Sequence, residues 1–265
     1  MAMCQRDNVN VYYESLGTGD PAIVFLHPFS TNHFIWAYQI PVFQANHRCI
    51  VVDHRGHGNS DKPESGYAIQ EMAADVIAIL DDCGIDKAVL VGNSIGGMIA
   101  MQTSLDAPER VIANLILSSG TNLGADTPPE VAEAMQSDWR AVFGGLMDAA
   151  ISEKSKREKP EIGAFMSGCY SGESNFNEQV FFANAGDPSG VFAWNISDRL
   201  KDISQPTLII AGKEDGATTP EQNQFLADNI PGSDIQIHDD IGHFCQLENP
   251  TLFNSELEKF LKKVA

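Results

Sequence analysis

Positive charge is scarce in this chain. Lysine and arginine together number 17 against 36 aspartates and glutamates, which gives a formal net charge of −19 over 265 residues. A surface this acidic repels phosphate backbones and anionic lipid head groups. We therefore expect a small-molecule substrate, with no nucleic-acid partner and no membrane partner.

Long apolar runs and paired cysteines are also missing. No run approaches the ~18 apolar residues that a membrane span needs, and the N-terminal MAMCQRDNVN has no apolar signal region. The five cysteines are widely spaced and never form a C-x-x-C pair, which is typical of reduced thiols and not of a disulfide or zinc framework. These absences predict a cytoplasmic protein. They leave its oligomeric state open, and a homo-oligomer is compatible with the sequence.

Short apolar runs alternate with helical patterns along most of the chain. The runs predict strands, and apolar residues at three- and four-residue spacing predict helices between them. All-apolar strands that alternate with helices indicate an α/β fold with a mostly parallel sheet covered on both faces. The predicted strands are 9–13, 22–26, 49–52, 88–91, 112–117, 207–211 and 234–238, and the predicted helices are 69–83, 95–105, 220–229 and 250–263.

Residues 121–200 interrupt this alternation. Apolar residues from Met135 to Met147 recur there at helical spacing, so we predict a helical cap insertion over 121–200 within a core domain formed by 1–120 and 201–265. Two tryptophans of the insertion, Trp139 and Trp194, are candidates for the substrate pocket, with core packing as an equal alternative.

The strongest chemical signal is the segment Gly92-Asn93-Ser94-Ile95-Gly96-Gly97, which lies directly between a predicted strand and a predicted helix. A serine on such a bend exposes its hydroxyl at the sheet edge, and glycines flank it because the backbone is strained and closely packed. The segment therefore predicts that Ser94 is a nucleophile.

A serine nucleophile needs a base, and the base needs a group that orients it. His243 follows the last predicted strand, and Asp215 follows the strand 207–211. Both therefore lie at the edge of the sheet that carries Ser94, where open α/β sheets build their sites. We predict His243 as the base and Asp215 as its partner.

Rival acids lie close to both residues. Glu214 is adjacent to Asp215 and points elsewhere in any regular backbone, whereas Asp239 and Asp240 are too near His243 in sequence to reach its far nitrogen. Asp215 stays the favoured acid.

A tetrahedral intermediate needs two N–H donors for its oxyanion. The backbone N–H of Ile95, the residue after the nucleophile, is the first candidate. The second lies in the segment His27-Pro28-Phe29-Ser30, which follows the strand 22–26. Because proline has no N–H, we predict Phe29, and its ring is also expected in the pocket wall.

Other conspicuous residues have plainer interpretations. His54 and His57 resemble a metal pair by spacing, but no third ligand is near them, which favours structural hydrogen bonds and no metal. A dinucleotide-binding glycine motif is absent, so we expect no cofactor. An anionic substrate would need a cation, and spacing does not choose between four candidates: Arg55, Arg110, Arg140 and Arg199.

Together these motifs resemble the α/β-hydrolase superfamily along nearly the whole chain outside the insertion. The stretch 51–63 (VVDHRGHGNSDKP) is similar to the D-x-R-G-x-G-x-S loop of that family, and the predicted nucleophile, acid and base occur in its usual chain order. The stretch 212–220 (GKEDGATTP), with Met98 after the paired glycines, most resembles the 3-oxoadipate enol-lactonases. Those enzymes open a small acidic enol-lactone ring without a metal or cofactor. The resemblance implies the α/β-hydrolase fold and hydrolysis of an ester or lactone through a Ser-His-Asp triad and an acyl-enzyme.

Two other functions stay open. The Asn93-Ser94 pair is like that of the meta-cleavage hydrolases, which implies C–C bond hydrolysis of a vinylogous diketone as the second enzymatic candidate. A non-catalytic ligand-binding relative is the third candidate, disfavoured because a pure binder has no need of all three predicted catalytic side chains. Serine at the bend argues against the dehalogenases and epoxide hydrolases of this fold, which use aspartate there.

Overall fold

An eight-stranded sheet forms the centre of the protein, in the order β1-β2-β4-β3-β5-β6-β7-β8. Strand β2 pairs antiparallel with β1 and with β4. All the other neighbouring strands in this order are parallel to each other. The strands are β1 (Ala2–Arg6), β2 (Val9–Leu16), β3 (Ala22–Leu26), β4 (Cys49–Val52), β5 (Ala88–Asn93), β6 (Val111–Leu117), β7 (Thr207–Gly212) and β8 (Asp234–His238). The mostly parallel sheet predicted from the sequence is confirmed.

The structure is a computed structural model that describes residues 2–121, 129–172 and 175–264. The parts of the predicted core and insertion at residues 1, 122–128, 173–174 and 265 lie outside the described residues. Within the described ranges, no helix combines the length and apolar character that a membrane crossing requires.

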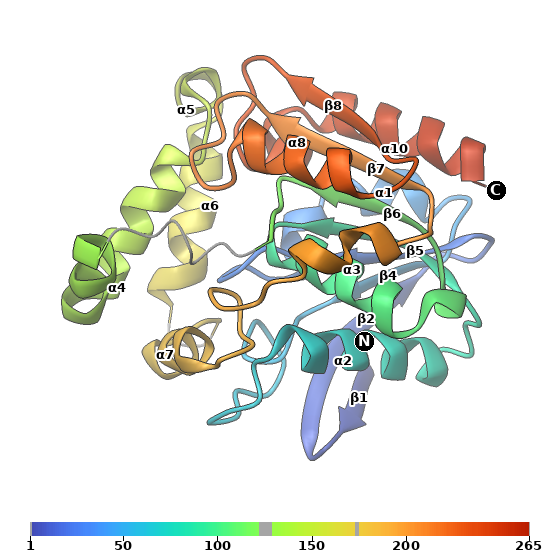
Figure 1. Cartoon of the computed structure of the whole chain (residues 1–265), viewed down its shortest axis with the longest axis horizontal. Coiled ribbons are helices and arrows are strands. Elements are labelled where there is room, and N and C mark those ends of the chain that lie inside the picture. Colours follow the sequence, from blue (N-terminus) through green and yellow to red (C-terminus); the bar gives the residue numbers. More distant parts are fainter. Residues whose placement is uncertain (1, 122–128, 173–174, 265) are drawn as a thin grey trace.

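Helices cover both faces of the sheet (Figure 1). Alternate residues of each strand point to opposite faces, so Val24 and Leu26 of β3 join one apolar core while Ile23 and Phe25 join the other. The first core includes side chains from α2 (Ile69–Asp82), α3 (Ile95–Asp106) and α8 (Pro220–Asn229). The second includes side chains from α1 (Ile40–Phe43), α9 (Cys245–Glu248) and α10 (Pro250–Val264). Short 3-10 helices are η1 (His33–Trp36), η2 (Pro108–Arg110) and η3 (Ser197–Asp202).

Four helices of the insertion gather beside one end of the sheet (Figure 1). They are α4 (Pro129–Ala149), α5 (Glu153–Glu158), α6 (Pro160–Ser171) and α7 (Glu178–Gly186), and α4 has a kink at Asp138. The connection from α4 to α5 bonds directly to loops that follow the carboxyl ends of strands: the carbonyl of Ala150 accepts from His243 N at 2.7 Å, and Glu153 N donates to Glu214 at 2.9 Å. The insertion therefore covers the edge where open α/β sheets carry their sites.

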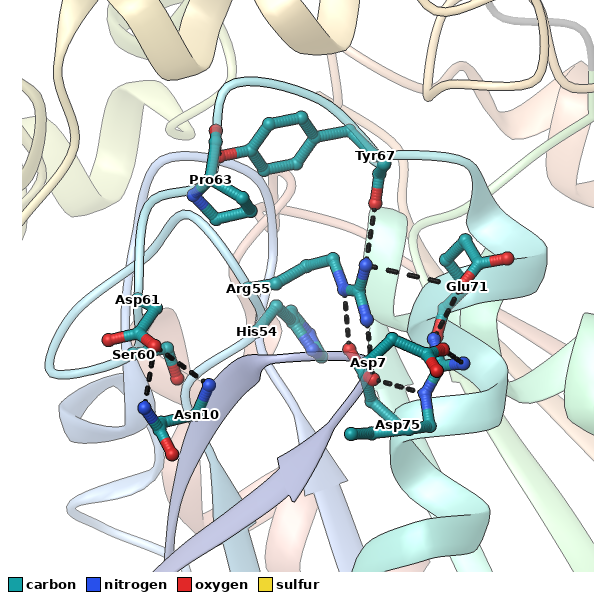
Figure 2. A network of polar contacts seen from close by, with 12 residues as sticks. Asp7, Asn10, His54, Arg55, Ser60, Asp61, Pro63, Tyr67, Glu71 and Asp75 are labelled. Atoms are coloured by element: carbon teal, nitrogen blue, oxygen red, sulfur yellow. Dashed lines mark hydrogen bonds and ion pairs between the residues drawn. The ribbon is translucent and has the colours of Figure 1, made fainter.

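A buried ion pair anchors the long loop that follows β4. Arg55 donates from Nε and Nη2 to the two carboxylate oxygens of Asp75 in α2, both at 2.7 Å, and its Nη1 donates to the carbonyl of Gly66 (Figure 2). Arg6 of β1 adds a third bond to Asp75 at 2.8 Å. This anchor fixes the loop that carries His54 and His57 against the hairpin β1–β2 and α2.

We expect Asp75→Asn to lower the free energy of unfolding by about 3–5 kcal/mol, because it leaves two guanidinium groups without their shared carboxylate at a buried position. Urea unfolding of wild type and variant measures the difference. The matched control is Asp61→Asn, at an exposed carboxylate that bonds Asn10, where the expected change is below about 1 kcal/mol. Equal effects of the two substitutions would contradict the anchoring role of the buried pair.

Candidate active site

Ser94 occupies a sharp bend between β5 and α3. Its φ of 55° and ψ of −116° lie in a region that side chains rarely adopt. The bend is closely packed, because a methyl group at Gly92 would collide with the carbonyl of Gly96, and one at Gly96 would collide with the carbonyl of Leu26 at the end of β3. Glycine at both positions therefore lets the bend form and brings the loop after β3 next to the first turn of α3.

Asp215 and His243 lie within hydrogen-bond distance in the loops after β7 and β8. His243 Nδ1 donates to Asp215 Oδ2 at 2.8 Å, and both side chains are buried. The other carboxylate oxygen accepts from the backbone N–H groups of Ala217 and Thr218 at 2.8 and 2.9 Å. Burial alone would raise the pKa of Asp215, but the charge and hydrogen bond of His243 and the two backbone donors together lower it. The carboxylate is thus held ionised against the imidazole.

The rival acids have other partners. Glu214 accepts a hydrogen bond from the backbone N–H of Glu153, and Asp239 and Asp240 each pair with an exposed lysine. Of the four acids considered, Asp215 is the one that bonds the His243 ring.

Asn93 connects the bend at Ser94 to the loop of His243. Its buried side chain donates to the backbone carbonyl of His243 at 3.2 Å and to that of Leu117 at 3.1 Å, and it accepts from Gln246 at 2.9 Å. Among the described residues the Ser94 hydroxyl and the His243 ring share no direct hydrogen bond, which is common in ligand-free sites. The sequence singled out Asn93 for its likeness to another family, not for this link.

The peptide group between Pro28 and Phe29 has a fixed orientation. The carbonyl of Pro28 accepts from His27 Nδ1 and Thr31 Oγ1, both at 2.8 Å, and from Thr31 N at 3.3 Å. Because His27 Nε2 accepts from the backbone N–H of His54 at 3.0 Å, the ring proton of His27 belongs on Nδ1. A trans peptide points its N–H opposite to its C=O, so these bonds also fix the direction of the Phe29 N–H.

The two predicted oxyanion donors are both uncommitted. Within the described part of the chain, no hydrogen bond uses the backbone N–H of Phe29 or of Ile95. Ile95 is the first residue of α3, where N–H groups have no partner in the helix. The close approach of Gly96 to Leu26 brings this helix end next to the loop that carries Phe29.

Aromatic side chains from the insertion surround the ring of Phe29. The rings of Phe143, Phe176, Phe181 and Phe192 have centroids 4.9–6.2 Å from it. Two tryptophans differ in their surroundings. Trp139 stacks on Phe181 at 4.7 Å and so belongs to this aromatic cluster, whereas the indole N–H of Trp194 donates to Gln102 of α3 at 2.8 Å within the core.

Three buried histidines, His27, His54 and His57, pack against one another, and the ring of His57 also contacts that of Phe29. His54 Nε2 donates to the carbonyl of His27 at 3.1 Å, and His57 Nδ1 donates to that of Arg55 at 3.1 Å. Burial lowers the pKa of His54 to about 4 and that of His57 to about 3, and it also lowers the pKa of His27. The three rings are therefore neutral near pH 7, and His54 and His57 make structural hydrogen bonds of the kind that the sequence favoured for them.

The four candidate arginines differ in availability. Arg55 is buried in its pair with Asp75, and Arg110 donates to backbone carbonyls just before β5, at the opposite end of that strand from Ser94. Arg140 lies 4.6 Å over the ring of Trp139, and Arg199 lies 4.0 Å from an aspartate of η3. Arg55 and Arg110 are thus unable to bind a substrate carboxylate at Ser94.

The chain belongs to the α/β-hydrolase fold family, whose model matches residues 21–250. The predicted family is therefore confirmed. Among curated relatives, the 3-oxoadipate enol-lactonase 2 of Acinetobacter baylyi is 29% identical over 97% of this chain and 94% of its own length. A 2-hydroxy-6-oxononadienedioate/2-hydroxy-6-oxononatrienedioate hydrolase of Burkholderia vietnamiensis is 27% identical over 96% of this chain and 92% of its own length.

A solved structure is much more similar in sequence. It is described as Est816, an N-acyl homoserine lactone degrading enzyme, and is 56% identical with a TM-score of 0.96 over 98% of this chain and 100% of its own. The enol-lactonase of Burkholderia xenovorans has the same fold, with a TM-score of 0.87 at 21% identity over 98% of this chain and 100% of its own.

We expect stability to fall as the pH falls from about 6.5 to about 4. The three buried histidines stay neutral in the folded chain, while in the unfolded chain they take up protons near pH 6.5, so acid favours unfolding. Each group contributes a slope of about 1.4 kcal/mol per pH unit within this window. Urea unfolding at pH 7, 6 and 5 measures the slope. His57→Phe removes one titrating group, so it should reduce the slope by about 1.4 kcal/mol per pH unit. A slope unchanged by that substitution would contradict a neutral, buried His57 in the folded chain.

Proposed function

We propose that this protein is a serine hydrolase of carboxylic esters and lactones, with Ser94 as nucleophile, His243 as base and Asp215 as the acid of the triad. The observation that carries the proposal is the ionised Asp215 bonded to His243 Nδ1 beside the strained Ser94 bend. The imidazole is then oriented with its other nitrogen available for proton transfer. Two uncommitted N–H groups, at Phe29 and Ile95, complete the requirements of acyl transfer.

The reaction follows from these positions. His243 accepts the proton of the Ser94 hydroxyl as its oxygen attacks the substrate carbonyl, and the Phe29 and Ile95 N–H groups stabilise the oxyanion. His243 then donates that proton to the departing alkoxide, which leaves an acyl-enzyme. In a lactone the alcohol stays attached to the acyl group. A water molecule, deprotonated by His243, releases the carboxylic acid and restores Ser94.

The surroundings of Ser94 favour a neutral substrate with an apolar acyl group. The wall around Phe29 is aromatic, and each of the four candidate arginines already has a partner: Asp75 for Arg55, backbone carbonyls for Arg110, the ring of Trp139 for Arg140 and Asp202 for Arg199. An acidic enol-lactone would need a cation for its carboxylate, whereas an N-acyl homoserine lactone carries no charge. The 56% identity to the homoserine lactone degrading enzyme supports the same choice. We therefore propose N-acyl homoserine lactones first and enol-lactones second.

Carbon–carbon bond hydrolysis is the second candidate function. The Asn93-Ser94 pair and the 27% identical relative from Burkholderia vietnamiensis favour it. Turnover of a vinylogous diketone at a higher kcat/KM than any lactone or ester would support this candidate over the first.

We expect wild type to hydrolyse N-acyl homoserine lactones and short p-nitrophenyl esters, and Ser94→Ala to lose about 10⁴-fold or more in kcat/KM because the nucleophile is gone. Initial rates over a panel that includes an acidic enol-lactone measure this. The matched control is Ser104→Ala, at a buried serine of α3 that bonds Asn114 and is expected to keep turnover. The proposed function would be contradicted if wild type hydrolysed no ester or lactone of the panel, or if Ser94→Ala kept undiminished activity.

A further inference from the structure

Asn175, in the segment between α6 and α7, connects the insertion to two loops of the core. Its side-chain amide donates to the carbonyl of Ser30 at 2.9 Å and accepts from Asn32 Nδ2 at 2.8 Å. Its backbone carbonyl accepts from Gly58 N at 3.0 Å. One residue of the insertion thus bonds both the loop after β3 and the loop after β4.

The amide of Asn175 is itself held in place. Its Nδ2 also donates to the carbonyl of Cys169 in α6 at 2.6 Å, and its backbone N–H donates to the carbonyl of Gly172 at 3.1 Å. These bonds fix which side of the amide carries the donor, because both partners of Nδ2 are carbonyl oxygens. Bonds within the insertion, to Cys169 and Gly172, therefore hold Asn175 in the orientation in which it bonds the core.

The carbonyl that Asn175 holds belongs to a strained residue of the predicted oxyanion loop. Ser30 has a φ of 63°, which is uncommon for a residue with a side chain and persists only where the surroundings hold it. On the core side, His27 and Thr31 fix the carbonyl of Pro28. On the side of the insertion, Asn175 fixes the carbonyl of Ser30. The Phe29 N–H shares a peptide group with the first carbonyl, and the backbone from Phe29 to the Cα of Ser30 is held between the two.

The next residue of the insertion packs on the same loop. The ring of Phe176 lies 4.9 Å from that of Phe29 and 4.8 Å from that of His57, and it is fully buried. The dipeptide Asn175-Phe176 therefore contacts the Phe29 segment through a hydrogen bond to its backbone and through its ring.

We propose that Asn175 is a positioning residue for the oxyanion hole: by bonding the carbonyl of Ser30, it holds the positive-φ turn that directly follows Phe29 and so keeps the Phe29 N–H in the direction that catalysis needs. The inference rests on the proposed function, because it assigns Phe29 to the oxyanion. It makes the geometry of the hole depend on Asn175, a residue of the insertion, so the insertion contributes to positioning as well as to the wall around Phe29.

Asn177 supplies the matched control. It is the same residue type two positions further along, and its side chain caps α7 by accepting from Val180 N at 2.9 Å. Asn177→Ala weakens the insertion without removing a bond to the loop after β3. A merely structural role of the insertion predicts similar losses in Asn175→Ala and Asn177→Ala.

The first experiment compares kcat, KM and inhibition in wild type, Asn175→Ala and Asn177→Ala. We expect Asn175→Ala to lower kcat about 10–100-fold with KM changed less than about threefold, because small misplacements of transition-state donors have effects of this size. The Ki of an alkyl trifluoromethyl ketone, which forms a tetrahedral oxyanion on the serine, should rise by the same factor. The Ki of the product carboxylic acid should stay within about threefold, and Asn177→Ala should keep wild-type kcat within about threefold. Equal losses in the two variants, or an unchanged ketone Ki in Asn175→Ala, would overturn the proposal.

The second experiment measures the protection of the loop after β3 from hydrogen exchange, which needs no turnover. Hydrogen exchange of the peptide covering residues 29–35 should speed up in Asn175→Ala and stay unchanged in Asn177→Ala. Asn32→Asp, which keeps the acceptor for Phe34 N and removes the donor to Asn175, should show a smaller increase in the same peptide. Unchanged exchange in Asn175→Ala would overturn the proposal even if wild type hydrolysed no ester or lactone. Absence of turnover in wild type, with faster exchange in the variant, would count against the proposed function and leave the loop contact supported.

Discussion

The close approach of two backbones, α3 at Gly96 and β3 at Leu26, is the constraint on which the site depends. The backbone is packed so closely at Gly92 and Gly96 that neither position tolerates a side chain. Strand β5 therefore runs directly into α3, and Ser94 is held at a positive φ. The same approach places the first N–H of α3 beside the loop after β3. The positions of the proposed nucleophile and of both proposed oxyanion donors thus follow from backbone packing, before any side chain of the proposed triad is considered.

Hydrogen bonds to backbone carbonyls orient most of the remaining parts. The carbonyl of Pro28 is held by His27 and Thr31, and that of His243 is held by Asn93. Such bonds act on peptide planes: those to the Pro28 carbonyl set the direction of the Phe29 N–H, which makes no hydrogen bond within the described part of the chain. The insertion bonds the core in both directions: the Asn175 amide donates to the carbonyl of Ser30, and the carbonyl of Ala150 accepts from the backbone N–H of His243.

Much of the fold could be predicted from the sequence because its signals are local. The strands 22–26, 49–52 and 234–238 and the helix 220–229 match the structure at both ends, since apolar runs mark the first two strands, alternating apolar residues mark the third, and Thr219 caps the helix. Strand β1 was missed, because its five residues have one buried side chain and its turn depends on positive φ at Asp7 and Asn8. The nucleophile, base and acid were proposed from spacing. The role of Asn175 was not, because its bond to Ser30 spans 145 residues and leaves no periodic pattern.

We propose above that an oxyanion formed at Ser94 is bound by the N–H groups of Phe29 and Ile95. A crystal structure of the enzyme with a trifluoromethyl ketone bound tests it most directly. We expect a covalent adduct on Ser94 whose oxygen lies roughly 2.7–3.1 Å from both backbone nitrogens. An adduct whose oxygen faces solvent or the His243 ring, or a ketone attached to another residue, would rule out this role of the two N–H groups.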